Sequence, residues 1–271
     1  MPDRPNAAEI RATFRALHVP GTPLVMPNAW DVGTAKLFAS LGFAAIATTS
    51  SGFAATLGRP DGDVSRDEAI AHTAALAAAT PLPVNADLED CFADSPAGVA
   101  ATITAAAEAG AAGASVEDWD RTAILPLPVA AERVAAAVDA ARPHGLVVTA
   151  RAENLIRGVD DLDDTIARLQ AYQEAGADVL YAPGLASVDD VRRIVDAVER
   201  PVNVLLVRGG PTVAELAEAG AARISVGGAL AWVAWGAVAD AARELLTAGT
   251  HGYDDLVRAG ARAAHEALSR F

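Results

Sequence analysis

Short apolar runs alternate with longer, alanine-rich amphipathic segments along most of the chain. A short apolar run is typical of a buried strand, whereas apolar residues at every third or fourth position indicate a helix. The alternation of the two patterns indicates an α/β protein. Eight strands are predicted in this way, at residues 24–26, 44–48, 82–86, 114–116, 147–150, 179–181, 202–206 and 223–226.

Helices are predicted before, between and after these strands. Several of them end at a glycine just before the next strand, where a left-handed C-cap is expected. Eight strands alternating with helices, with no Pro/Ser-rich linker, favour a (β/α)8 TIM barrel over a doubly wound sheet, and one domain covering residues 1–271. The predicted helices are 7–17, 32–41, 66–78, 96–109, 129–141, 162–175, 188–198, 213–219, 230–246 and 253–268.

The last two helices are unusual, because a minimal barrel needs only one helix after its eighth strand. Trp232 and Trp235 lie three positions apart on the first of them, so they share one face. Base rates for apolar helix faces favour a stripe that packs on the core, and a contact between subunits is the alternative.

Composition narrows the possible partners and the compartment. The net charge of −14 and the pI of about 4.7 argue against nucleic acid and against anionic membranes, which both attract basic surfaces. No apolar run approaches the roughly 20 residues that span a bilayer, and residues 1–4 do not resemble the start of a signal peptide. We therefore expect a cytoplasmic protein. The single cysteine, Cys91, excludes an intrachain disulfide and agrees with a reducing compartment.

The scarce side chains limit the chemistry. The only lysine, Lys36, falls in a predicted helix, so no lysine is obviously placed for Schiff-base formation. The five histidines form no pair with the spacing of metal ligands. Cys91 stands beside acids that should raise the pKa of its thiol, so we interpret it as structural. The groups that remain available for catalysis are carboxylates, arginine, hydroxyls and a hard cation.

Charged residues follow three neighbouring predicted strands. In a TIM barrel the site lies at the carboxyl ends of the strands, so these side chains are candidates for it. Clustered acids repel one another unless a cation lies among them, and carboxylate oxygens suit Mg2+ or Mn2+. For any single acid, a solvated loop charge is the alternative. The charged residues are Asp87, Glu89 and Asp90 after the third strand, Glu117 and Asp118 after the fourth, and Arg151 and Glu153 after the fifth.

Other segments at strand ends are candidates for binding an anion. Ser50-Ser51-Gly52-Phe53 could present backbone N–H groups to a carboxylate or enolate oxygen, or form an ordinary turn. Arg151 has the planar fork that matches a substrate carboxylate. Asp61 lies in a turn-rich loop, where an acid is more often a turn former than a catalyst. The pairs 209–210 and 227–228 of glycines are a weak signal for a phosphate site.

These residues resemble the isocitrate lyase/phosphoenolpyruvate mutase superfamily from Pro27 to about Ala229. The resemblance implies a (β/α)8 barrel whose eighth helix is exchanged with a neighbour, in a homodimer or homotetramer. That exchange would account for the C-terminal helices at about 230–271. The matching segments are Pro27-Asn-Ala-Trp-Asp31, Ser51-Gly52-Phe53, Leu57-Gly-Arg-Pro-Asp61, Asp87-x-Glu89, Val116-Glu117-Asp118, Ala150-Arg-Ala-Glu153 and Pro201-Val-Asn203.

The resemblance also implies a site. Mg2+ would be held near Asp87, Glu89 and Glu117, largely through water, with a 2-oxo acid or its enolate on the metal. The family's pattern assigns ligand binding to Ser51, Gly52, Phe53, Arg151 and Asn203, and catalysis to Asp61, Glu117 and Arg151. Catalysis in this family makes or breaks a C–C or P–C bond next to a pyruvate-like enolate.

Departures from the family's pattern affect the expected reaction. The lyases carry cysteine and histidine in the loop after the fourth strand, but residues 118–125 contain neither, and Pro183 falls where the lyases have glutamate. We therefore hypothesise a Mg2+-dependent lyase or hydrolase that cleaves a C–C bond of a small 2-oxo or 2-hydroxy carboxylic acid through a metal-bound enolate. The alternatives are P–C chemistry on phosphonopyruvate and a barrel that binds 2-oxo acids without turnover.

Overall fold

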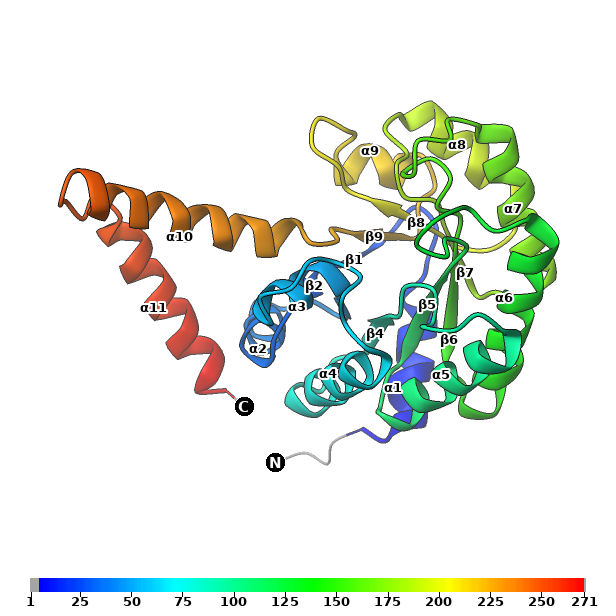
Figure 1. Ribbon diagram of the computed structural model, residues 1–271, viewed down its shortest axis with the longest axis horizontal. Helices are drawn as coiled ribbons and strands as arrows, with labels where there is room; N and C mark the ends of the chain where they lie inside the picture. Colours follow the sequence, from blue (N-terminus) through cyan, green and yellow to red (C-terminus); the bar gives the residue numbers. More distant parts are fainter. Residues whose placement is uncertain (1–4, 271) are drawn as a thin grey trace.

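The strands form one ring of parallel strands, seen in a computed structural model that describes residues 5–270 (Figure 1). The ring closes at its first strand, which is interrupted at Pro27: β1 (Leu24–Met26) pairs with β9 (Arg223–Ser225), and β2 (Asn28–Ala29) pairs with β3 (Ile46–Thr48). Proline has no N–H to donate to a neighbouring strand, which accounts for the break.

The predicted TIM barrel is confirmed, and every predicted strand is present. β1 and β2 together make the first barrel strand, so nine segments supply eight positions in the ring. Only the short β2 segment was not predicted, because Pro27 ends the apolar run before it. The other strands are β4 (Val84–Asp87), β5 (Gly113–Glu117), β6 (Val147–Arg151), β7 (Val179–Tyr181) and β8 (Val202–Leu205).

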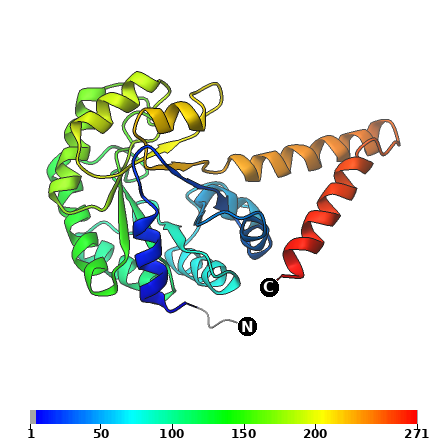
Figure 2. The same ribbon diagram turned by 180° about the vertical axis from the view of Figure 1, so that it is seen from behind.

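Helices cover the outside of the ring, and the apolar core lies between them and the strands (Figure 2). Tyr172, Leu180 and Ile194, from two helices and a strand, have no exposed surface and pack in one cluster of this core. α1 (Ala7–Ala16) instead lies at the amino end of the ring, where Phe14 packs on the first residues of β1, β6 and β7. The covering helices are α2 (Val32–Ser40), α4 (Arg66–Ala79), α5 (Pro96–Glu108), α6 (Leu127–Ala141), α7 (Leu162–Glu174), α8 (Val188–Ala197) and α9 (Val213–Glu218), with a 3-10 turn, η1, at Arg142–His144.

The helix ends follow the sequence signals. The predicted glycine stops have the left-handed backbone that a C-cap requires, with φ of 91° at Gly42 and 98° at Gly176. One helix was not predicted: α3 (Ser50–Thr56) occupies the segment that resembled a turn. Thr49 caps it by accepting a hydrogen bond from the Gly52 N–H, and a glycine inside so short a segment hides the helical pattern.

The two C-terminal helices leave the barrel as an arm. α10 (Ala229–Thr247) extends outward and α11 (Asp254–Leu268) turns back toward α2 (Figures 1 and 2). Trp232 is 48% exposed and Trp235 57% exposed, so the prediction that this stripe packs on the core was wrong. The apolar pattern correctly indicates one apolar face of α10. This face does not pack on the core because α10 projects away from the barrel. No helix in residues 5–270 is long and apolar enough to cross a membrane.

Candidate active site

A cavity of about 560 Å3 opens at the carboxyl ends of the strands. Parallel strands of a barrel all end on this side, so the last residues of β4 to β7 line one space. The wall carries acids, arginines and hydroxyls in close proximity. Its polar lining includes Ser50, Ser51, Asp61, Asp87, Glu89, Asp90, Ser115, Glu117, Arg121, Arg151, Glu153, Arg157, Tyr181, Asn203, Arg223 and Ser225.

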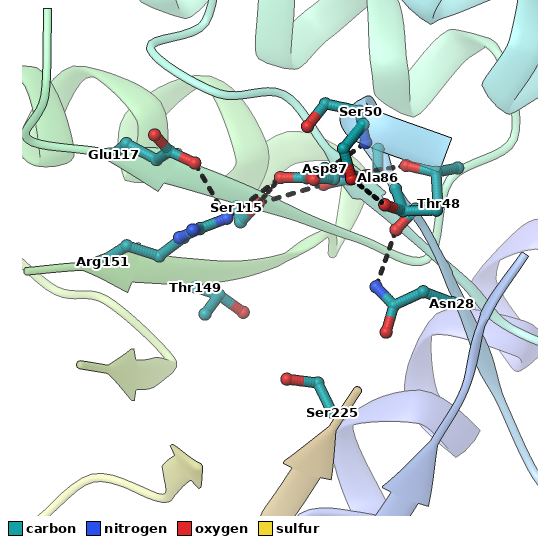
Figure 3. A network of polar contacts seen from close by, with 12 residues as sticks. Asn28, Thr48, Ser50, Ala86, Asp87, Ser115, Glu117, Thr149, Arg151 and Ser225 are labelled. Carbon is teal, nitrogen blue, oxygen red and sulfur yellow. Dashed lines mark hydrogen bonds and ion pairs between the residues drawn. The ribbon is translucent and has the colours of Figure 1, made fainter. Parts of the chain in front are cut away.

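Arg151, at the end of β6, is the centre of the acidic group (Figure 3). Its Nη1 lies 2.8 Å from Glu117 Oε1 and 3.1 Å from Asp87 Oδ1, and its Nη2 lies 2.9 Å from Glu153 Oε1. Burial alone would lower the pKa of Arg151, but the three carboxylates outweigh it and raise that pKa. One guanidinium thus balances only part of the negative charge around it.

Asp87, at the end of β4, is held by its neighbours in a fixed orientation (Figure 3). Its Oδ2 accepts a hydrogen bond from the Ser50 N–H at 3.1 Å, and its Oδ1 accepts one from Ser115 Oγ at 3.3 Å. Its own N–H donates to Thr48 Oγ1 at 2.8 Å. The first residue of α3 and the strands on both sides therefore aim this carboxylate at Arg151.

Asp118 follows Glu117 in sequence, but its side chain is buried outside the cavity and bonds to residues that hold the site. It is 2% exposed and does not line the cavity. Its Oδ2 accepts hydrogen bonds from Tyr172 Oη at 2.6 Å and Arg168 Nη1 at 3.1 Å, and its Oδ1 accepts one from the Glu153 N–H at 2.8 Å. Asp118 therefore fixes the backbone of Glu153, which in turn holds Arg151.

Glu89 and Asp90 face a different arginine. Arg121, in the loop after β5, lies 3.5 Å from Glu89 Oε2 and 3.4 Å from Asp90 Oδ2. Arg121 and Glu89 both have left-handed backbones, with φ of 75° and 51°, which is rare for residues other than glycine. Burial, and after it the charge of Asp87, raises the pKa of Glu89 to about 7, against the effect of Arg121.

The predicted metal ligands do not converge directly. In residues 5–270 no group of three His, Cys, Asp or Glu side chains is arranged to hold a metal ion, because the Arg151 guanidinium lies between Asp87 and Glu117 while Glu89 turns to Arg121. The donor set still suits a hard cation. Glu89 Oε1 is buried without a hydrogen-bond partner, and burial raises the pKa of Glu117 despite its bond to Arg151. The residues fit a divalent cation.

The predicted ligand-binding residues lie at different depths. Ser51 lines the cavity, and Asn203 lines its floor with no exposed surface. Gly52 and Phe53 lie outside the lining, and their N–H groups donate to Thr49 within the first turn of α3. Asp61 lines the rim, close enough to Glu89 for its charge to contribute to the raised pKa of that residue.

Sequence reasoning missed several side chains of the site. Tyr181 ends β7 with its ring 4.9 Å below the Arg151 guanidinium carbon, and Ser225 ends β9. Arg157 stacks on Trp119 at 4.7 Å and lies 3.3 Å from Glu153 Oε2. The position of Tyr181 at a strand end was the available signal, but an aromatic there is more often core. Cys91 has no exposed surface, and burial raises the pKa of its thiol, which agrees with the predicted structural role.

Comparison with known proteins decides the family. The sequence model of phosphoenolpyruvate phosphomutase matches residues 14–246. This chain belongs to that family. The predicted resemblance to the isocitrate lyase/phosphoenolpyruvate mutase superfamily is thereby confirmed.

Relatives within the phosphomutase family carry several names. A crystal structure of a Burkholderia cenocepacia protein, provisionally named a lyase/mutase, is 50% identical with a TM-score of 0.89, and the match covers 92% of each chain. An uncharacterised Mycobacterium tuberculosis protein is 36% identical over 219 residues, 79% of this chain and 81% of the relative. The 2-methylisocitrate lyase of Salmonella typhimurium is 31% identical over 210 residues, 73% of this chain and 70% of the relative.

Proposed function

We propose that this protein is a Mg2+-dependent lyase or hydrolase that cleaves a C–C bond of a small 2-oxo or 2-hydroxy carboxylic acid and leaves an enolate. The observation that supports it most is Arg151 at the mouth of the barrel, within 3.1 Å of both Asp87 and Glu117. This grouping places cation-binding oxygens beside a guanidinium that can take a carboxylate.

Named relatives support carboxylate chemistry. A 2-methylisocitrate lyase is among the sequence relatives, and an oxaloacetate acetylhydrolase of 25% identity and TM-score 0.86 was solved with its product oxalate. A phosphonopyruvate hydrolase that shares the fold at 24% identity was solved with oxalate and Mg2+. Oxalate has the shape and charge of a planar pyruvate enolate, so it is a suitable binding probe.

We assign the residues to roles as follows. Ser51, at the start of α3, binds one end of the acid, while Arg151 and Asn203 bind its oxygen atoms. Gly52 and Phe53 hold the first turn of α3 in place through their hydrogen bonds to Thr49. Asp87, Glu89 and Glu117 hold Mg2+, or Mn2+, chiefly through water. Asp61 stands at the rim, where it can approach the reacting carbon. When bound, the cation supplies a positive charge that stabilises negative charge developing on a substrate oxygen.

Two alternatives remain proposals beside this one. P–C cleavage of phosphonopyruvate is favoured by the phosphomutase family match. A binding protein without turnover is favoured by the loop after β5, which supplies Arg121 but no cysteine or histidine to the cavity within the part of the chain described.

Calorimetric titration with product analysis tests the function. Oxaloacetate, pyruvate, 2-oxoglutarate, phosphonopyruvate and oxalate would be added with and without Mg2+. We expect binding that depends on Mg2+, and C–C cleavage of at least one acid. Phosphate release from phosphonopyruvate alone would favour P–C chemistry, and binding without any product would favour the binding protein.

A matched pair of variants tests the cation site. Asp87→Asn removes one charge from the site, and we expect the Mg2+-dependent part of oxalate binding to be lost. Asp94→Asn removes one charge from an exposed residue outside the cavity and should leave that binding unchanged. Equal Mg2+ dependence in both variants would contradict the assignment.

We also propose that the arm formed by α10 and α11 covers a second copy of this chain. Its exposed apolar residues include Trp232, Trp235, Val238 and Leu246, the last 86% exposed, and only Ala231 of α10 is buried. Light scattering should give a dimer or tetramer. Val238→Glu with Leu246→Glu should shift the mass toward the monomer, and a monomeric wild-type protein would refute the proposal.

A further inference from the structure

A cleavage that leaves an enolate needs a proton for the enolate carbon. Within residues 5–270, no histidine, cysteine or lysine side chain lines the cavity. Most of its carboxyl groups are committed to Arg151, Arg121 or Arg157. Apart from acids and arginines, the ionisable side chain of the lining is the phenol of Tyr181.

A chain of hydrogen bonds with a fixed direction leads to this phenol from the floor of the barrel. Arg223 is 2% exposed, and its Nε donates to Asn203 Oδ1 at 2.9 Å. A guanidinium has donors only, so it settles which end of the Asn203 amide is the acceptor. The amide nitrogen of Asn203 then points to Ser225 and donates to its Oγ at 3.0 Å.

The direction continues through Ser225 to Tyr181. Ser225 Oγ already accepts from Asn203, and its own proton is free to be donated. Tyr181 is the other side chain that forms a hydrogen bond with the side chain of Ser225 in the described residues. With Ser225 donating to Tyr181 Oη, the proton of Tyr181 is left to point at a ligand in the cavity.

The surroundings of Tyr181 suit a group that gives up a proton only in the course of the reaction. Burial raises the pKa of Tyr181, so the phenol is protonated at neutral pH, while Arg151 and the Ser225 hydrogen bond act in the opposite direction. The guanidinium carbon of Arg151 lies 4.9 Å from the centre of the ring. The positive charge of Arg151 would therefore stabilise the phenolate left after transfer.

We propose that Tyr181 is the proton donor to the enolate carbon, with Ser225, Asn203 and Arg223 as the residues that position its hydroxyl. The O–H bond of Tyr181 breaks, a C–H bond forms on the enolate carbon, and the negative charge moves to Tyr181 Oη. Water then returns a proton to the phenolate. In the reverse direction the phenolate removes a proton from the methyl group of pyruvate. This assignment rests on the proposed function.

Proton exchange tests the proposal without the natural substrate. Pyruvate in D2O with Mg2+ and the wild-type protein should gain deuterium at its methyl group, followed by proton NMR. We expect Tyr181→Phe to lower the exchange rate by about 100-fold or more, a typical effect of removing a general acid–base group. Oxalate affinity in the presence of Mg2+, measured by calorimetry, should stay within about threefold, because the ring and Arg151 remain.

Two further variants separate a donor from a merely structural tyrosine. Tyr253→Phe makes the same change at the turn before α11 and should exchange at the wild-type rate. Ser225→Ala should lower the exchange rate in the wild-type background and have no further effect in the Tyr181→Phe background, because both act through one hydroxyl.

The results that overturn the donor role differ from those that overturn the proposed function. Wild-type exchange in Tyr181→Phe, or additive losses in the double variant, would reject Tyr181 as the donor. Oxalate binding by the wild-type protein with no pyruvate exchange would also reject it. If the wild-type protein neither binds oxalate nor exchanges the methyl protons of pyruvate, both the proposed function and the donor role are rejected.

Discussion

Two arginines occupy the inside of the barrel in opposite surroundings. Arg151, near the mouth, is bonded to three carboxylates. Arg223, near the floor, is bonded to neutral acceptors: Asn203 Oδ1, Thr149 Oγ1 and His18 Nε2. Burial lowers the pKa of Arg223 to about 9, whereas the acids raise that of Arg151.

The two arginines therefore serve different purposes. In each bond of Arg151 both the guanidinium and its carboxylate partner are charged, so an entering anion can compete for Arg151 and an entering cation can compete for the carboxylates. The partners of Arg223 are neutral and tightly buried, and a ligand gains little by replacing them. The mouth of the barrel is therefore arranged for exchange of partners, and the floor is arranged to keep its polar groups oriented. The predictions below test this contrast, from the largest expected effect to the smallest.

Removing the central charge at the mouth should have the largest effect. Arg151→Met leaves Asp87, Glu117 and Glu153 buried together with only Arg157, 3.3 Å from Glu153 Oε2, as a counter-charge. The free energy of unfolding should fall by about 3–5 kcal/mol. Mg2+ should restore part of this loss because it neutralises the same acids. Urea denaturation with and without Mg2+ measures both effects. A loss below about 1 kcal/mol would mean that the acids do not depend on Arg151.

Acid should weaken the floor through His18. Its Nδ1 donates to the Phe14 carbonyl at 2.9 Å and its Nε2 faces Arg223, so the ring is held neutral. Burial, and then Arg223, lowers the pKa of His18 to about 3 from an unfolded value of 6.5. The unfolded chain therefore binds the proton first, and the stability present above pH 6.5 falls by about 2–3 kcal/mol as the pH drops to 4.

A pair of histidine variants isolates this effect. In His18→Gln the fall in unfolding free energy between pH 7 and pH 4 should be smaller by that amount, as measured by urea denaturation at each pH. His251→Gln, at an exposed position outside the barrel, should keep the wild-type pH dependence. Identical slopes in the two variants would show that His18 is not the group responsible.

Replacing the floor arginine should have the smallest effect of the three. Arg223→Met leaves the acceptors of Asn203 and Thr149 without a donor but leaves no unpaired charge, so we expect a loss of about 1–3 kcal/mol in unfolding free energy. Urea denaturation of this variant beside Arg151→Met gives the direct comparison. A larger loss than for Arg151→Met would reverse the contrast between floor and mouth.

Local sequence patterns were sufficient to predict the barrel, but they did not predict which side chains inside it contact one another. The eight apolar runs and the glycine stops have short-range causes, which one sequence contains. The bond between His18 and Arg223 joins residues 205 positions apart, and no spacing rule indicates it. The stripe of Trp232 was assigned to the wrong surface, because periodicity locates an apolar face without saying what covers it.

The candidate site was predicted in composition more than in arrangement. Strand ends identified Asp87, Glu117 and Arg151, and the structure places each of the two acids within 3.1 Å of the Arg151 guanidinium. They did not indicate that the guanidinium would stand between the two acids, nor that Asp118 would turn away to Tyr172. Which partner each acid bonds to depends on the residues that the adjacent strands place next to it. That arrangement is set only when the ring of strands closes.

The start of α10 connects the arm directly to the cavity. Gly228, the residue just before this helix, lines the cavity, and the helix then runs for 19 residues away from it. At 1.5 Å per residue it is about 28 Å long, so a tilt of about 5° at the cavity moves the far end by about 2.5 Å. A label placed near Thr247 would amplify small displacements at the cavity, and a load attached there would act back on Gly228.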